Sequence, residues 1–151
     1  MKSPRFEHCR VGHLQQLSIG MEAARKTRTT AHGLSDKALE AFSLALRAED
    51  QRCRNELEEA RACLLEALRI RRELAKECSD VYAPEVAATL NSLGNLQYDV
   101  KDFDAALASH EEALKIRRKL AKLRPEVYGP DVALTLINLG NVQRALNKPE
   151  A

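Results

Sequence analysis

The chain has 151 residues, of which 44% are hydrophobic and 30% charged, with no tryptophan, six glycines and five prolines. This composition fits one soluble, mainly helical domain. The formal net charge of +2 is too small for the broad positive field of a nucleic-acid or membrane-surface protein. No stretch approaches the roughly 18 apolar residues of a membrane span, and the start MKSPRFEHCR lacks the apolar core of a secretory signal. We therefore expect no membrane or nucleic-acid partner and a cytoplasmic location.

The first 34 residues form an N-terminal extension with one expected helix. Apolar residues recur near helical spacing over 11–28; they are Val11, Leu14, Leu17 and Met21. The segment 29–34 then reads as a connector. Ser35 is suited to cap a second helix that runs to about residue 51, because its hydroxyl can accept a hydrogen bond from a free backbone N–H.

The remainder of the chain predicts four further helices separated by short turns. Apolar stripes of helical period occur in each of them, and no segment alternates with the period of two that a strand requires. Pro84 and Pro130 are expected to open two of these helices, since proline is favoured at the first helical position. The expected helices cover about 55–77, 84–99, 103–122 and 130–147.

The sequence repeats itself at an offset of 46 residues. Residues 66–97 and 112–143 are identical at 20 of 32 aligned positions. A repeat of this length is typical of stacked helical units, in which each unit buries its apolar face against its neighbours. The stack builds a continuous surface, which favours a binding function over catalysis.

The stretch LNSLGNLQ, followed by DFDAALASHEEALKI, resembles a tetratricopeptide repeat. The longer period, with ALKIRRKLAK followed by PEVYGPDVA, resembles the extended repeat of kinesin light chains. The resemblance implies an all-α, right-handed α-solenoid of antiparallel helix pairs over 35–151. Its units would span about 35–80, 84–126 and an incomplete 130–151. His110 occupies the place that is usually aromatic, so we expect it to pack between helices.

The same resemblance implies binding of another protein through a concave groove lined by the first helix of each unit. An asparagine amide both donates and accepts hydrogen bonds, so it can hold a peptide backbone of any sequence. The alternative is that these asparagines satisfy neighbouring backbone groups or solvent. The expected peptide contacts are Asn91, Ser92, Asn95, Tyr98, Asn138, Asn141 and Arg144. The alternative function is homo-oligomerisation through the C-terminal solenoid edge, or a structural spacer in a larger signalling or scaffold protein.

The residues show no sign of catalysis, a cofactor or a metal. No nucleophile elbow or phosphate-binding glycine loop is present. His8, Cys9 and His13 match no common zinc spacing, and the four cysteines form no CxxC pair, so reduced thiols are expected. The basic tract at 115–119 and its earlier copy at 69–72 are expected on solvated helix faces. We therefore expect a non-catalytic protein without a cofactor.

Overall fold

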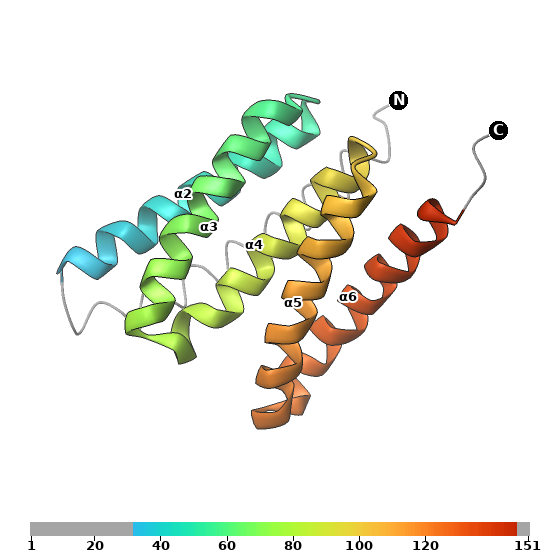
Figure 1. Ribbon diagram of the computed structural model, residues 1–151. Coiled ribbons are helices and arrows are strands. Elements are labelled where there is room, and N and C mark those ends of the chain that lie inside the picture. The colour runs from blue at the N-terminus through green and yellow to red at the C-terminus, as the bar shows by residue number, and fades with distance from the viewer. Residues whose placement is uncertain (1–31, 148–151) are drawn as a thin grey trace, which may run out of the picture. The chain divides into compact units, whose positions relative to one another are not determined.

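The computed structural model describes residues 32–147, with side chains from Asp36 onward (Figure 1). This part of the chain contains only helices and short turns. The helices are α2 (His32–Cys53), α3 (Leu57–Glu77), α4 (Ser79–Asp99), α5 (Phe103–Leu123) and α6 (Pro125–Leu146). The prediction of an all-α fold with packed helix pairs is confirmed for the described residues, whereas the helix expected at 11–28 lies outside them.

The helices fall into two compact units, one up to Val81 and the other from Tyr82 onward. In the first unit α2 packs against α3, and in the second α5 packs against α6 (Figure 1). Small buried residues let α2 and α3 approach closely, and leucines fill the remaining space. In α2 and α3 the buried residues include Ala41, Ala45, Ala48, Ala60, Leu64, Ala67 and Leu74. The predicted limits of the individual repeats remain predictions.

The turns after α2 and α4 share one backbone conformation. Asn55 has a φ of 66° and Lys101 a φ of 64°, and the two residues occupy the same repeat position. The amide of the next residue, Asp102, donates to the carbonyl of Gln97 at 2.8 Å, while Lys101 N donates to the carbonyl of Tyr98 at 3.0 Å. This pattern satisfies the last carbonyls of a helix that ends in a left-handed residue. Asp102 then caps α5, because its Oδ1 accepts from Ala105 N at 3.2 Å.

The sequence predicted that Pro84 and Pro130 open two helices, but in the structure they do not. α4 begins at Ser79 and α6 at Pro125, so Pro84 and Pro130 lie inside the helices, in their second turn. Only Cys78 and Arg124, both with φ near −140°, separate α4 and α6 from the helices before them. Each internal proline removes one backbone hydrogen bond. Near Pro84 the buried Tyr82 supports the helical segment, whereas Val127 near Pro130 is exposed. The expected start of α2 at Ser35 is also wrong, by three residues.

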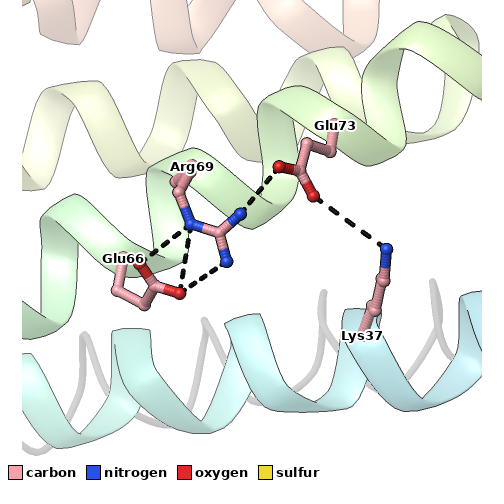
Figure 2. A network of polar contacts seen from close by, with 4 residues as sticks. All are labelled: Lys37, Glu66, Arg69 and Glu73. Carbon is pink, nitrogen blue, oxygen red and sulfur yellow. Dashed lines mark hydrogen bonds and ion pairs between the residues drawn. The ribbon is translucent and has the colours of Figure 1, made fainter.

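A solvent-exposed polar network links α2 and α3 (Figure 2). Arg69 Nη2 donates to Glu66 Oε1 at 2.7 Å, and its Nη1 donates to Glu73 Oε1 at the same distance. Lys37 Nζ lies 4.0 Å from Glu73 Oε2. The hydrogen bond from Arg69 lowers the pKa of Glu66. Exposed pairs of this kind contribute little to stability, so the prediction of a solvated face holds for Arg69.

Two features of the described helices concern the cellular location. No helix between residues 32 and 147 is long and apolar enough to cross a membrane. Cys63 and Cys78 have free thiols, whereas Cys53 is disulfide-bonded, so the expectation of reduced cysteines is wrong at Cys53. The cytoplasmic location remains a prediction.

Candidate functional site

Three of the predicted contact residues form an asparagine bridge between α4 and α6, made of Asn91, Asn95 and Asn138. Asn138 Nδ2 donates to Asn91 Oδ1 at 3.1 Å and to Asn95 Oδ1 at 3.2 Å. Asn91 and Asn95 are four residues apart and therefore share one face of α4. Each such hydrogen bond contributes about 1 kcal/mol net. The asparagine bridge thus fastens α6 to α4 and places several amides side by side.

The asparagine bridge uses only part of its hydrogen-bonding capacity. Within residues 36–147, the Nδ2 groups of Asn91 and Asn95 and the Oδ1 of Asn138 make no hydrogen bond. Asn91 is 8% exposed, while Asn95 and Asn138 are half-buried. The asparagine bridge thus retains two donor groups and one acceptor, the kinds of group that an extended backbone pairs with.

The other predicted contact residues lie around the asparagine bridge without hydrogen-bonding to it. Asn141 Oδ1 instead faces Arg144 Nη2 at 3.5 Å, and Arg144 is exposed. Tyr98 is exposed too, and its ring packs against Phe103 with centroids 5.4 Å apart. Ser92 is buried. The structure therefore brings three of the four asparagines together, pairs the fourth with Arg144, and leaves Tyr98 beside solvent.

The interface between α4 and α5 is unusually close at one point. His110 is 1% exposed, and its ring atoms lie 2.7–2.9 Å from the place where a Cβ on Gly94 would stand. Burial first, and then the charge of Arg117, lower the pKa of His110. The predicted packing role of His110 is confirmed. Next to it, the Ser109 hydroxyl lies 2.6 Å from the Gln97 side-chain amide, a contact that sequence reasoning missed.

The sequence predicted that Arg117 lies on a solvated helix face, but the structure buries it. It is 6% exposed, and its Nη1 donates to the Thr135 hydroxyl and to the carbonyl of Asp131. Burial lowers the pKa of its guanidinium, although nearby Asp131 opposes this effect. The earlier copy of this position, Arg71, is also buried. The signal in the sequence was the recurrence of an arginine between apolar positions in both copies of the repeat. A guanidinium that is buried at such a position must be hydrogen-bonded.

The described residues contain no group of three or more His, Cys, Asp or Glu side chains that could hold a metal ion. The one weak candidate in the sequence, at His8, Cys9 and His13, lies outside the described residues.

Comparison with known families gives one match. Residues 86–124, which cover most of α4 and all of α5, match the model of the tetratricopeptide repeat. The extended kinesin-light-chain type inferred from the 46-residue period is consistent with this match. No curated protein and no solved structure matches the chain significantly.

Proposed function

We propose that the chain holds a peptide or helix of a partner protein along the asparagine-bearing faces of α4 and α6, because residues 86–124 match the tetratricopeptide repeat and such repeats are typically non-catalytic modules for binding other proteins. The observation that carries this proposal is the asparagine bridge, in which the two hydrogen bonds donated by Asn138 hold three side-chain amides close together. The proposed contacts are Asn91, Asn95, Asn138 and Asn141, flanked by Ser92, Tyr98 and Arg144.

The mechanism is recognition of a peptide backbone by amides that are already held in place. Because Asn138 fixes Asn91 and Asn95, the peptide does not bear the entropy of ordering these side chains. Hydrogen bonds to the backbone give affinity that is independent of the peptide sequence. We expect the exposed Tyr98 ring to favour apolar side chains of the peptide and the exposed Arg144 guanidinium to favour acidic ones. Buried Ser92 would act only by supporting its neighbours.

The test is selection of binders from a displayed library of random peptides, followed by fluorescence anisotropy with the best peptide. We expect the Asn95→Ala/Asn141→Ala double variant to bind at least about tenfold more weakly, since lost hydrogen bonds to a peptide cost about 1 kcal/mol each. The matched control is Asn147→Ala, because Asn147 is an exposed asparagine at the end of α6. Equal affinity of the folded double variant and the control would refute the proposal.

A second candidate function is self-association through the C-terminal edge. Leu136 and Ile137 on α6 are 44% and 61% exposed, and apolar exposure of this kind favours burial against another surface. Sedimentation velocity of the wild type and of a Leu136→Gln variant measures this directly. A dimer that persists in the asparagine double variant and dissociates in Leu136→Gln would favour this candidate over peptide binding.

A further inference from the structure

α6 repeats much of the sequence of α4, but no other helix of the described part of the chain covers its equivalent surface. Leu90 is 2% exposed, whereas Leu136, 46 residues later, is 44% exposed. Gly94 is buried under the His110 ring, whereas Gly140 is exposed and has nothing within 4 Å of the place where its Cβ would stand. Two nearly identical helix surfaces therefore differ in whether another helix lies on them.

The contacts between α4 and α5 show what α6 is built to receive. α5 places a ring on Gly94 and a hydroxyl 2.6 Å from the Gln97 side chain. α6 offers Gly140 and the exposed Gln143 at the same spacing, with Leu139 beside them. A helix with a ring, a small polar residue and small apolar residues in the order found in α5 can therefore make the same contacts on α6.

The charge of the surface beside α6 determines which helices with such an apolar face can bind there. A hollow of about 470 Å³ lies between α5 and α6, with Leu114 and Leu139 among its apolar lining residues. Four basic side chains and a single acidic one also line it; they are Lys115, Arg118, Lys119, Lys122 and Glu111. An occupant therefore needs acidic residues on the flank that faces α5. A second copy of this edge would bring the same basic residues against their own kind, which disfavours symmetric pairing.

We propose that the open face of α6, together with the basic hollow beside it, is a docking site for an acidic amphipathic α-helix of a partner protein. The helix seats a ring on Gly140 and presents Asp or Glu side chains to the α5 lysines and arginine. This site is separate from the asparagine bridge and does not depend on it. The module therefore has two binding surfaces, one for a peptide backbone and one for a helix.

The probe is a capped synthetic helix that keeps Ser109, His110 and the small apolar residues of 102–123 and carries Glu on the flank that faces α5 when the His110 ring lies on Gly140. The control probe carries Lys at the same flank positions and has the same apolar face. The protein is the full 151-residue chain, with two matched variants, Gly140→Ala and Gly129→Ala. Gly129 also lies in α6 and also has open space at its Cβ position, so both variants leave the free fold intact.

We expect the acidic probe to bind the wild type and Gly129→Ala equally, and Gly140→Ala at least about tenfold more weakly. The control probe should bind at least about tenfold more weakly than the acidic probe at low ionic strength, with a smaller difference at high salt. The proposal is overturned if the acidic probe binds Gly140→Ala as tightly as the wild type, or if it does not bind the wild type below about 1 mM. A dimer of the free chain that Gly140→Ala abolishes assigns this face to a second copy and also overturns it.

Discussion

The substitution Gly94→Ala tests the close packing of α4 on α5, with Gly140→Ala as its internal reference. Both glycines occupy the same position of the repeat inside a helix, so both gain about 1 kcal/mol of helix propensity from alanine. At Gly94 the new methyl group would stand 2.7 Å from two atoms of the buried His110 ring, and at Gly140 it meets nothing. Overpacking of this kind costs about 1–3 kcal/mol. The free energies of unfolding of the two variants should therefore differ by about that amount.

Urea unfolding followed by circular dichroism measures this difference. Gly140→Ala should raise the midpoint above that of the wild type, and Gly94→Ala should lie below Gly140→Ala by on the order of 1 M. In a His110→Ala background the penalty of Gly94→Ala should disappear, because the ring that causes it is gone. If the two alanine variants are equally stable, or if the His110 background changes nothing, the close contact does not determine the packing.

Four further outcomes are expected from individual contacts. Thr135→Val should destabilise the fold by about 1–3 kcal/mol in urea unfolding, because it removes one partner of the buried Arg117; an unchanged midpoint would contradict that role. Since burial lowers the pKa of His110 below its ordinary value of about 6.5, the unfolded state binds more protons below that pH. Wild-type stability should then be fully present above about pH 6.5 and fall below it more steeply than in His110→Phe; parallel pH profiles would refute this. Lys101→Gly should stabilise the fold by about 1 kcal/mol in thermal unfolding, because it relieves a left-handed backbone; a lower midpoint would contradict the strain. Arg69→Ala should leave the midpoint unchanged, since its ion pairs are exposed; a clear loss would show that the network matters.

The helical architecture follows from the sequence because its signals are local. Apolar residues at helical spacing placed α3 and α5 within two residues of their observed ends. The short turn between the helices expected at 84–99 and 103–122 was also predicted correctly. The starts of α4 and α6 were not, because each helix begins before the proline that was expected to open it, and the turn before Pro84 is held by burial and not by a local signal. Tyr82 shows this best, since its burial depends on contacts that a local pattern does not contain.

The candidate site was predictable in composition but not in geometry. The repeat identified the asparagines, and their helical spacing placed Asn91 and Asn95 on one face. That Asn138 bridges these two residues depends on how α6 lies against α4, which no local pattern specifies. Arg117 was misplaced for a similar reason. A basic residue in a charged tract is usually solvated, and the partners that make its burial acceptable, Thr135 and the Asp131 carbonyl, lie on the next helix.

Nuclear magnetic resonance of the asparagine side-chain amides tests the proposed peptide site most directly. The ¹⁵N-labelled chain would be titrated with the peptide selected from the random library. The account predicts that the Nδ2 signals of Asn91, Asn95 and Asn138 shift in proportion to binding, while the backbone signal of Gly129 does not. If the peptide binds and the asparagine signals stay in place, the asparagine bridge serves only to join α4 to α6, and the proposed peptide site is wrong.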